Sequence, residues 1–276
     1  MTPPARAAFQ GERGAYSEEA ALALFPDAEP MPCASLRDVF AAVTEGRAAW
    51  GVVPVENSQA GSINETYDLL LAHALHIVGE YDLRVRHCLL ALPGRTLADL
   101  RAVYSHPQAL AQCEEFLRAH RLEAIAAYDT AGSARMVAER RMEDAGVIAG
   151  RRAAGLYGLA ILAEGIETNP HNYTKFLALG TAPAPRSAAS KTSIVFTTRN
   201  VPGALHRALG AFAARAINLT KLESRPRREV PWEYVFYVDF EGHRDDPEVA
   251  AALRELEAVA AFVRVLGSYP RAPRPL

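Results

Sequence analysis

The sequence predicts a mixed α/β protein built from two consecutive domains. Its 276 residues exceed the length of a usual single domain and favour about two. Through residues 1–180, short apolar runs alternate with helical patterns, as they do in β-α-β units. Beyond them the order changes to strand, helix, strand, strand, helix, strand, which is the order of a ferredoxin-like domain.

The first elements are predicted from apolar runs and capping signals. A strand over residues 5–10 runs into the loop GERGAYS, where Ser17 can cap a helix whose first turn carries two glutamates. Ser35, with Asp38 three residues later, predicts a second helix that continues to about Glu45. A buried strand follows over residues 50–55, and residues 76–92 fit one long bent strand.

The rest of the first domain continues the alternation. We expect strands at 101–104, 122–128 and 146–149. We also expect a helix over 108–118, a second helix that begins near residue 130, and a short third helix that ends at Tyr157. This order fits two α/β lobes, with the chain crossing between them more than once. A cleft between two lobes is a common place for a ligand.

The second domain is separated from the first by a small-residue, Pro-containing linker in the stretch GTAPAPRSAASK. We predict a first domain over residues 1–182, a linker over 183–191, a second domain over 192–270 and a disordered tail over 271–276. The expected elements of the second domain are strands at 194–198, 217–223, 233–240 and 263–266, and helices at 203–215 and 247–260.

Composition favours a small-molecule partner. The formal net charge is −2, without the dense basic stripe typical of nucleic-acid binders. No run approaches the roughly 18 apolar residues of a membrane span, and the first residues lack a signal-peptide apolar region, so a cytoplasmic location is expected. The three cysteines show no CxxC spacing, which favours buried thiols over a zinc site or a disulfide framework.

The stretch NPHNYTKFLAL, residues 169–179, is the strongest candidate for chemistry. A polar loop leads directly into an apolar strand, a placement typical of binding loops on a rigid scaffold. It contains Thr174 and also Lys175, which is the single lysine of residues 1–180, where fifteen arginines supply the other positive charges.

An ordered set of motifs resembles the prephenate dehydratase family. In the first domain the motifs are GERGAYSE (11–18), GVVPVENSQAGSINETYDLL (51–70), HCLLAL (87–92), VYSHPQALAQC (103–113), LYGLAIL (156–162) and NYTKFLAL (172–179). In the second domain PGALH (202–206), INLTKLESRP (217–226) and WEYVFYVDFEGH (232–243) resemble the regulatory ACT domain that follows it in monofunctional members. The resemblance implies a two-lobed, periplasmic-binding-protein-like catalytic domain followed by a ferredoxin-like ACT domain.

The resemblance also implies an activity. Members of the family convert prephenate to phenylpyruvate, water and carbon dioxide on the route to phenylalanine, and the reaction needs no metal or redox cofactor. The implied protein is a homodimer or homotetramer that L-phenylalanine inhibits, with no nucleic-acid or membrane partner. Arogenate, with an amine in place of the side-chain keto group, is an alternative substrate, and a non-catalytic two-lobed sensor is an alternative function.

By resemblance, the catalytic residues are Thr174, Glu56 and Asn57. A threonine is too weak an acid to be matched to neutral pH, so a hydrogen bond to the departing oxygen is favoured over full proton transfer. Glu56 suits proton donation better, because a nearby dianion and burial would raise its pKa. The alternatives are a threonine that bonds its own loop and a glutamate that caps loop backbone.

The predicted substrate-binding residues come from the same motifs. Gln108 and Gln112 lie one helical turn apart and can share a face. Thr130, Ala131 and Ser133 lie at a helix start, where they can attract an anion or simply act as caps. Lys175 replaces the arginine that is usual in the family, which keeps the charge but not the two-pronged geometry. The complete set is Ala15, Tyr16, Ser58, Ser105, Gln108, Gln112, Thr130, Ala131, Ser133, Asn172, Lys175 and Phe176.

The second domain carries the predicted effector site. Two motifs match those with which the family binds phenylalanine between two ACT domains. One consists of small residues at the start of a helix, and the other is the polar end of a strand. A plain Pro-Gly helix start and an exposed turn are the alternative. The predicted effector residues are Gly203, Ala204, Leu205, Asn218, Leu219, Glu223, Ser224, Arg225 and Pro226.

Overall fold

The computed structural model describes residues 4–227 and 233–273. Contacts divide the chain into two compact units, 1–67 with 81–176 and 68–80 with 177–276. The last three residues of the predicted tail, 274–276, lie outside the described residues.

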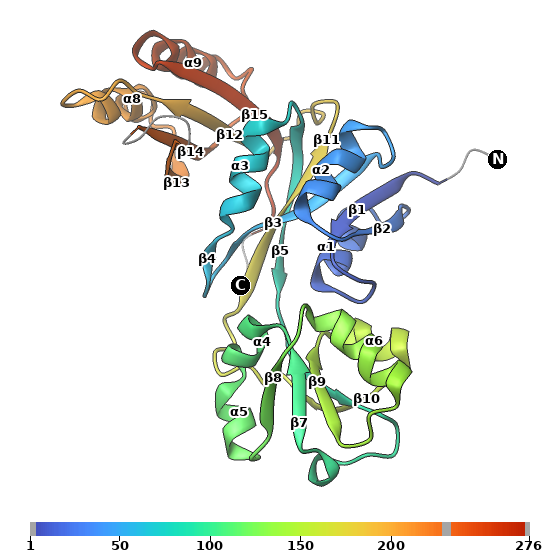
Figure 1. The fold of residues 1–276 in the computed structure, drawn as a ribbon. Helices are drawn as coiled ribbons and strands as arrows, with labels where there is room; N and C mark the ends of the chain where they lie inside the picture. Colours follow the sequence, from blue (N-terminus) through green and yellow to red (C-terminus); the bar gives the residue numbers. More distant parts are fainter. Residues whose placement is uncertain (1–3, 228–232, 274–276) are drawn as a thin grey trace. The chain divides into compact units, whose positions relative to one another are not determined.

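The first unit contains two lobes, each built on its own sheet. In the first lobe the strand order is β2-β1-β3-β11-β5, with β4 paired to β3 (Figure 1). β1 is parallel to both β2 and β3, as expected for strands joined by helical crossovers. The elements are β1 (Arg6–Gln10), α1 (Tyr16–Leu24), β2 (Glu29–Cys33), α2 (Leu36–Thr44), β3 (Trp50–Asn57), β4 (Gly61–Ser62), α3 (Asn64–Ala72), β5 (His76–Arg84) and β11 (Tyr173–Gly180). Residues 68–72 of α3, 76–80 of β5 and 177–180 of β11 belong to the second unit.

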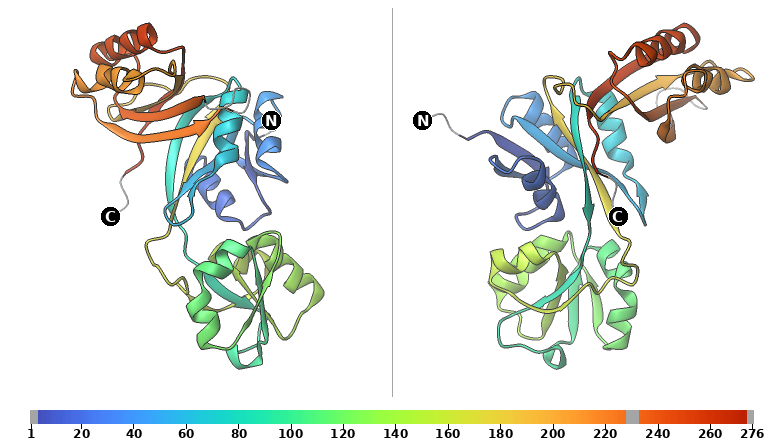
Figure 2. Two further views of the ribbon diagram at one scale, coloured as in Figure 1. Left: turned by 60° about the vertical axis from the view of Figure 1, so that its left-hand side comes forward. Right: turned by 180° about the vertical axis from the view of Figure 1, so that it is seen from behind.

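The second lobe has a five-stranded sheet in the order β10-β6-β9-β7-β8. Two apolar clusters show that α4 and α5 cover one face of this sheet, while α6 and α7 cover the other (Figure 2). The elements are β6 (Cys88–Ala91), η1 (Leu97–Asp99), β7 (Ala102–Ser105), α4 (Pro107–Gln112), α5 (Glu114–Ala119), β8 (Glu123–Ala126), α6 (Thr130–Arg140), β9 (Ala145–Ala149), α7 (Arg151–Tyr157) and β10 (Ala160–Glu164).

Two segments carry the chain between the lobes. Residues 85–87 lead from β5 to β6, and residues 165–172 lead from β10 back to β11. The two crossings are hydrogen bonded to each other, because the Val85 N–H donates to the Asn172 carbonyl at 2.8 Å. The expected mixed α/β fold with two lobes is therefore present, and the long strand predicted over 76–92 is instead two strands separated by the first crossing.

The second unit contains a four-stranded antiparallel sheet in the order β13-β14-β12-β15. α8 and α9 pack on the sheet through a core that includes Phe196, Phe212 and Leu253. This arrangement confirms the predicted ferredoxin-like order. The elements are β12 (Ser190–Thr197), α8 (Ala204–Ala213), β13 (Leu219–Pro226), β14 (Tyr234–Glu241), α9 (Pro247–Val259) and β15 (Phe262–Pro270).

Residues 68–80 join the second unit through specific contacts. A Cβ on Gly267 would lie 2.1 Å from the Ile77 carbonyl oxygen, so only glycine fits where β15 meets β5. Lys191 donates to Glu80 at 2.7 Å, with only 8% and 1% of the two side chains exposed. Arg264 donates to the carbonyls of Leu71 and His73, which satisfies orphan acceptors at the end of α3.

Several predicted details of the helix ends are wrong. Ser35 and Asp38 form the expected capping box, but Ser17 is not a cap, since α1 begins after Ala15. Asp129, rather than Thr130, caps α6 by accepting the Gly132 N–H. The helix predicted over 108–118 is divided at Cys113 into α4 and α5.

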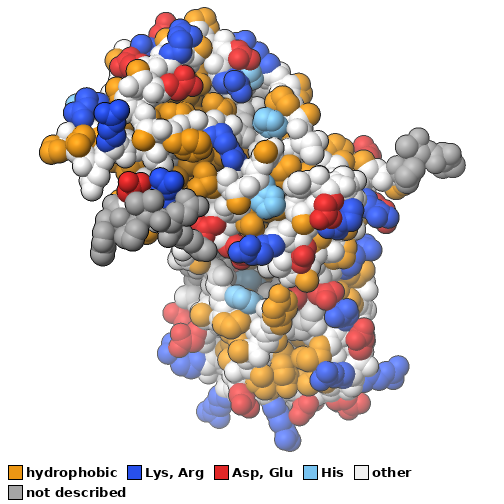
Figure 3. Space-filling model, turned by 45° about the horizontal axis from the view of Figure 1, so that its top comes forward, with side chains coloured by type: hydrophobic (Ala, Val, Ile, Leu, Met, Phe, Trp, Pro, Cys, Tyr) orange, Lys and Arg blue, Asp and Glu red, His pale blue; other side chains and the backbone are white. Residues whose placement is uncertain are grey.

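The described surface is of mixed charge. On the face drawn in Figure 3, Lys and Arg side chains are interspersed with Asp and Glu. Among the described residues, no helix is both long and apolar enough to cross a membrane.

Candidate functional site

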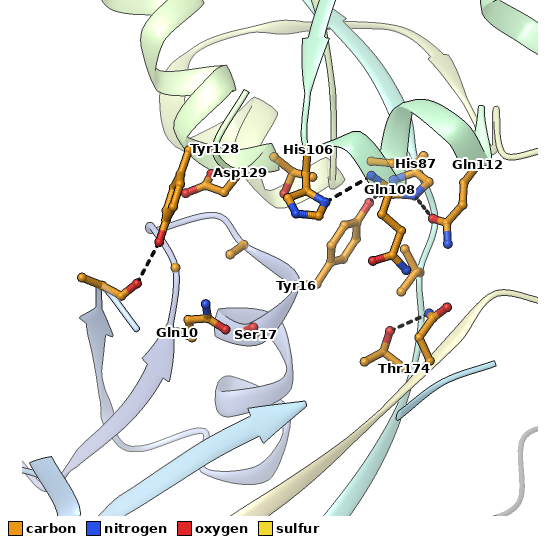
Figure 4. A pocket seen from close by; sticks show the side chains of 17 residues that line it. Gln10, Tyr16, Ser17, His87, His106, Gln108, Gln112, Tyr128, Asp129 and Thr174 are labelled. Atoms are coloured by element: carbon orange, nitrogen blue, oxygen red, sulfur yellow. Dashed lines mark hydrogen bonds between the residues drawn. The ribbon is translucent and has the colours of Figure 1, made fainter. Parts of the chain in front are cut away.

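A cavity of about 370 Å³ lies between the two lobes of the first unit. Both lobes contribute to its wall, and the side chains that surround it are mainly polar and aromatic (Figure 4). The lining residues are Gln10, Gly11, Ala15, Tyr16, Ser17, Ala34, Asn57, Val85, His87, His106, Gln108, Ala109, Gln112, Tyr128, Asp129, Thr130 and Thr174.

Thr174 faces this cavity from β11, directly after the second crossing. Its Oγ1 accepts a hydrogen bond from Asn57 Nδ2 at 3.0 Å, and 9% of the residue is exposed. Asn57 is held in turn by its own loop, because its Oδ1 accepts the N–H groups of Gln59 and Ala60 at 3.1 and 3.0 Å. Since the Thr174 oxygen already accepts from Asn57, its O–H is the part left to donate to a ligand.

The contact between Asn57 and Thr174 is one end of a longer series of hydrogen bonds. Asn57 Nδ2 also donates to Asn172 Oδ1 at 2.8 Å, and Asn172 Nδ2 donates to Gln112 Oε1 at 3.0 Å. Gln112 Oε1 lies 2.8 Å from His87 Nε2, and His87 Nδ1 lies 2.9 Å from the Tyr16 hydroxyl. We call this series, from Tyr16 to Thr174, the amide–imidazole chain.

The amide–imidazole chain links both lobes of the first unit and both crossings between them. His87 lies in the first crossing and Asn172 lies in the second. Tyr16, Asn57 and Thr174 belong to the first lobe, whereas Gln112 ends α4 of the second lobe. Polar networks of this kind specify a unique arrangement when their members are satisfied.

His87 is only 2% exposed, and burial lowers the pKa of its imidazole, although the Gln112 hydrogen bond and the charge of Glu167 act in the opposite direction. An unfolded histidine has a pKa of about 6.5. Below that pH the unfolded chain takes up a proton that the native protein does not, so stability is lost as the pH falls through about 6.5.

The stability of the wild type should therefore fall more steeply with acidification than that of His87→Gln, which has no imidazole to protonate. Between pH 6.5 and the lower pKa of the native imidazole, the difference in unfolding free energy should change by up to about 1.4 kcal/mol for each pH unit. Denaturant unfolding of both proteins over a series of pH values measures it. Parallel stability curves would show that His87 takes up its proton equally in the folded and unfolded states.

A buried carboxylate shapes the cavity wall formed by the loop after β1. Glu18 is fully buried and accepts from Arg13 Nε at 2.9 Å, Arg152 Nε at 2.7 Å and the Gly14 N–H at 2.7 Å. Burial raises the pKa of this carboxyl, but the hydrogen bonds and the charge of Arg152 outweigh it, so the pKa is lowered overall. Gly14 has φ +89° and lies against Ala153, where a side chain would meet the backbone of α7. These contacts hold the loop that presents Ala15 and Tyr16.

The structure brings seven of the predicted first-domain site residues to the cavity. Six of them come from four separate motifs, Thr130 lies outside the motifs, and both lobes contribute, as a cleft site requires. These residues are Ala15, Tyr16, Asn57, Gln108, Gln112, Thr130 and Thr174.

The other predicted site residues lie outside the lining, several because their polar groups bond elsewhere. Ser105 donates to the Ile148 carbonyl at 2.6 Å, Ser133 to the Asp129 carbonyl at 2.6 Å, and Ser58 to the His171 carbonyl at 3.0 Å. Asn172 acts through the amide–imidazole chain, and Ala131 and Phe176 are buried apolar residues.

Glu56 and Lys175 also lie outside the lining, each beside a residue that belongs to it. Neighbouring residues of a strand point to opposite faces, so with Asn57 and Thr174 toward the cavity, Glu56 and Lys175 point away from it. Lys175 donates to Asp82 at 2.6 Å on β5. This pairing places its charge on the strand that leads into the first crossing.

Ten of the seventeen lining residues were not in the predicted site, and three of these ten have side chains whose contacts bear on the cavity. His87 belongs to the motif HCLLAL, but its position in that motif did not predict that its side chain would face the cavity. His106 caps α4 by accepting the Gln108 N–H at 3.2 Å. Tyr128 is 78% exposed and donates to the Ala34 carbonyl at 3.2 Å, which joins the two lobes at the mouth of the cavity (Figure 4).

The predicted effector residues of the second unit fall into two groups. Gly203, Ala204 and Leu205 line a second cavity of about 380 Å³ together with Tyr234 and Phe236. The others lie at or next to β13, an edge strand of the sheet, and outside that cavity: Asn218, Leu219, Glu223, Ser224, Arg225 and Pro226.

Arg225 has a partner within the second unit. Its guanidinium donates to Asp68 at 2.8 Å. No group of His, Cys, Asp and Glu in the described part of the chain is arranged to hold a metal ion.

Comparisons with known proteins agree with this organisation. A family model described as prephenate dehydratase matches residues 7–184, and a model described as the ACT domain matches residues 192–258. Arogenate dehydratase/prephenate dehydratase 2, chloroplastic, of Arabidopsis thaliana is 49% identical over 276 residues, which cover 96% of this chain and 72% of the relative. Arogenate dehydratase 2 of Petunia hybrida is 46% identical over 96% of this chain and 71% of its own.

Solved structures give the same result. The crystal structure of prephenate dehydratase from Arthrobacter aurescens in complex with L-Phe has a TM-score of 0.88 at 32% identity, covering 96% of this chain and 90% of its own. A protein described as GqqA, a novel type of quorum quenching acylase, has a TM-score of 0.90 at 38% identity, covering 97% of this chain and 98% of its own. The fold class predicted from sequence is therefore confirmed.

The comparisons contradict one expectation. Several relatives, including two further Arabidopsis thaliana proteins at 46% identity, are named chloroplastic. The prediction of a cytoplasmic location, which rested on the first residues of the chain, is therefore wrong.

Proposed function

This chain belongs to the prephenate dehydratase family, whose members are lyases, and we propose that it converts prephenate to phenylpyruvate, carbon dioxide and water. The observation that carries the proposal is the Thr174 hydroxyl, oriented by Asn57 toward a cavity between two lobes. A non-catalytic sensor is the weaker reading, since the family consists of enzymes.

The reaction sets three tasks for the cavity. The bond between the ring and the carboxylate breaks, and its electron pair enters the ring. The ring C–O bond breaks, and the hydroxide that leaves takes up a proton to become water. The protein must bind an anionic substrate, stabilise the departing oxygen, and keep water away from the carboxylate that leaves as carbon dioxide.

Thr174 suits the second task as a hydrogen-bond donor. Its oxygen accepts from Asn57, which leaves the O–H to donate toward the departing hydroxyl. A preorganised donor aimed at developing charge contributes about 2.7–4 kcal/mol of barrier lowering. Gln108 and Gln112, on the opposite lobe, offer amide groups to the substrate oxygens.

The cavity lining does not include the remaining predicted residues, among them Glu56, Ser58, Ser105 and Lys175. A direct role in the site is therefore less well supported for these residues. We therefore propose Thr174 and Asn57 as the catalytic pair.

Arogenate is the second candidate substrate, because relatives at 46–49% identity carry both names or that of arogenate dehydratase alone. Steady-state kinetics of the purified chain on prephenate and on arogenate, side by side, decide the preference by the ratio of the two kcat/KM values. A ratio in favour of arogenate would replace the leading substrate and leave the chemistry unchanged.

We also propose that L-phenylalanine regulates the enzyme through the second unit. Support comes from the matching ACT model and from the relative solved in complex with L-Phe. Gly203, Ala204 and Leu205 line a cavity, while Glu223 and Ser224 lie on an edge strand, so the two motifs would complete one site if two ACT domains associate. We therefore favour a homodimer or larger assembly.

Gly203→Ala should weaken the binding of L-phenylalanine at least tenfold. Gly203 has φ +76°, which costs a residue with a side chain about 1–2 kcal/mol, and the new Cβ would lie 2.9 Å from Arg207 Nη1 at the wall of the cavity. Titration calorimetry of the full chain with L-phenylalanine measures the effect. Gly210→Ala is the matched control, since a Cβ at Gly210 of α8 meets nothing within 4 Å. Equal affinities in the two variants would remove Gly203 from the effector site.

A further inference from the structure

The amide–imidazole chain has a defined direction, which is set first at Asn57. The Asn57 Oδ1 accepts the N–H groups of Gln59 and Ala60, and backbone N–H groups can only donate. The other side of the amide must therefore be the NH2, whose two hydrogens face three acceptors: Asn172 Oδ1, Thr174 Oγ1 and the Tyr173 carbonyl. No rotation of the Asn57 amide preserves these contacts.

The orientations of the next two amides, those of Asn172 and Gln112, follow from the orientation of Asn57. Because Asn172 accepts from Asn57 through its oxygen, its Nδ2 faces Gln112 and donates to Gln112 Oε1 at 3.0 Å. The Gln112 oxygen therefore points into the protein. Its NH2 group donates to no residue in the described part of the chain, although Gln112 lines the cavity.

His87 meets the same oxygen from the other side. Its Nε2 lies 2.8 Å from Gln112 Oε1, which already accepts from Asn172, so the imidazole must carry hydrogen on Nε2. Its Nδ1 then holds a lone pair toward the Tyr16 hydroxyl at 2.9 Å. The Tyr16 hydroxyl also lies 3.0 Å from the Arg86 carbonyl, so it can donate to either acceptor.

We propose that His87, as the Nε2–H tautomer, is a positioning residue that holds the Gln112 amide with its oxygen inward and its NH2 group toward the substrate. The inference deepens the proposed function, on which it rests for the identity of the substrate. An NH2 group donates to the carboxylate or hydroxyl oxygens of an anionic substrate, whereas a rotated amide would present a carbonyl oxygen and repel them.

The alternative states of His87 would disturb this arrangement. The Nδ1–H tautomer would place a lone pair against the Gln112 oxygen and would favour rotation of the amide, which would break the bond from Asn172 as well. The groups that face His87 are Tyr16 from α1, Gln112 from α4 and Glu167 from the second crossing. Glu167 accepts the His87 backbone N–H at 2.9 Å rather than a ring nitrogen.

Two substitutions at His87 separate positioning from packing. In His87→Gln the side-chain Nε2 reaches about as far as the imidazole Nε2 and can still donate to Gln112, while His87→Asn reaches only to the position of Nδ1. Both replacements are neutral amides in the same buried space. His120→Asn is the control, because His120 is exposed at the end of α5 and outside the cavity.

We expect His87→Asn to lower kcat/KM about tenfold, mainly through KM, on whichever of prephenate and arogenate the wild type converts. The kcat/KM of His87→Gln should stay within about threefold of the wild-type value. His120→Asn should match the wild type. Equal activity of the Asn and Gln variants, whether both high or both low, would overturn the inference.

A spectroscopic measurement tests the inference without turnover. Imidazole ¹⁵N spectra of the unliganded full chain, with the His87 signals assigned by the His87→Gln variant, should show hydrogen on Nε2 and a bare Nδ1 at neutral pH. A protonated ring or hydrogen on Nδ1 would contradict the inference. If the wild type turns over neither substrate, the proposed function fails, while this spectrum still decides the tautomer.

Gln112→Glu tests the orientation of the Gln112 amide if the His87 variants do not fold. The carboxylate can still accept from His87 and Asn172, but it places a negative oxygen where the NH2 group stood. KM for the anionic substrate should rise more than tenfold. An unchanged KM would overturn the orientation assigned to Gln112.

Discussion

Thr174→Ala is expected to lower kcat about 10²–10³-fold, the loss that follows removal of one donor aimed at developing charge. The Thr174 hydroxyl is the group at the cavity whose oxygen accepts from Asn57 and whose O–H remains for the substrate. KM should change less than kcat, because the hydrogen bond strengthens as the hydroxide departs. Initial rates of phenylpyruvate formation over a range of prephenate concentrations measure both constants.

Thr174→Ser is the matched control for that experiment. It keeps the hydroxyl and its contact with Asn57 while removing one methyl group, so most of the rate should remain. Thermal unfolding of both variants shows whether the fold is intact. Equal rates in the Ala and Ser variants would remove the hydroxyl from the mechanism.

Lys191→Met is expected to destabilise the second unit by about 3–5 kcal/mol, the usual cost of leaving one member of a buried ion pair without its partner. Lys191 and Glu80 are 8% and 1% exposed and lie 2.7 Å apart. The Ala272 N–H also donates to Glu80 at 3.0 Å, but a single amide does not replace a full positive charge. Denaturant unfolding with a probe in the second unit measures the change.

Two further variants test the cause of that effect. Lys191→Met combined with Glu80→Gln should recover part of the stability, because the Glu80 charge is removed together with that of Lys191. The buried Asp239 carboxyl still loses the nearby Lys191 charge in this variant, so recovery should not be complete. Arg186→Met removes an exposed ion pair with Asp246 in the same unit and should cost less than about 1 kcal/mol. If the double variant is as unstable as Lys191→Met, packing rather than charge explains the loss.

The order of elements was predictable because it depends on local signals. Apolar runs located most strands, and the Ser35 box marked the start of α2 as expected. The cap at Ser17 failed because Glu18 bonds the Gly14 N–H and two arginines, an arrangement that depends on α7 more than 130 residues away. Such a contact leaves no trace in the local sequence.

The site was predictable as a set of motifs but not as a set of side chains. Glu56 and Asn57 are neighbours on β3, and only the orientation of the strand decides that Asn57 faces the cavity. Ser105 and Ser133 carry hydroxyls that suit a ligand, yet each bonds a backbone carbonyl instead. His87 was not among the predicted site residues, because its ring contacts Gln112 and Tyr16, which are distant in sequence.

The conversion of prephenate labelled with ¹³C in its ring carboxylate is the direct test of the proposed reaction. The purified wild type should release one labelled carbon dioxide for each phenylpyruvate formed, and Thr174→Ala should do so at least a hundredfold more slowly. The proposed reaction would be refuted if the wild type left prephenate unchanged while a known prephenate dehydratase converted it under the same conditions.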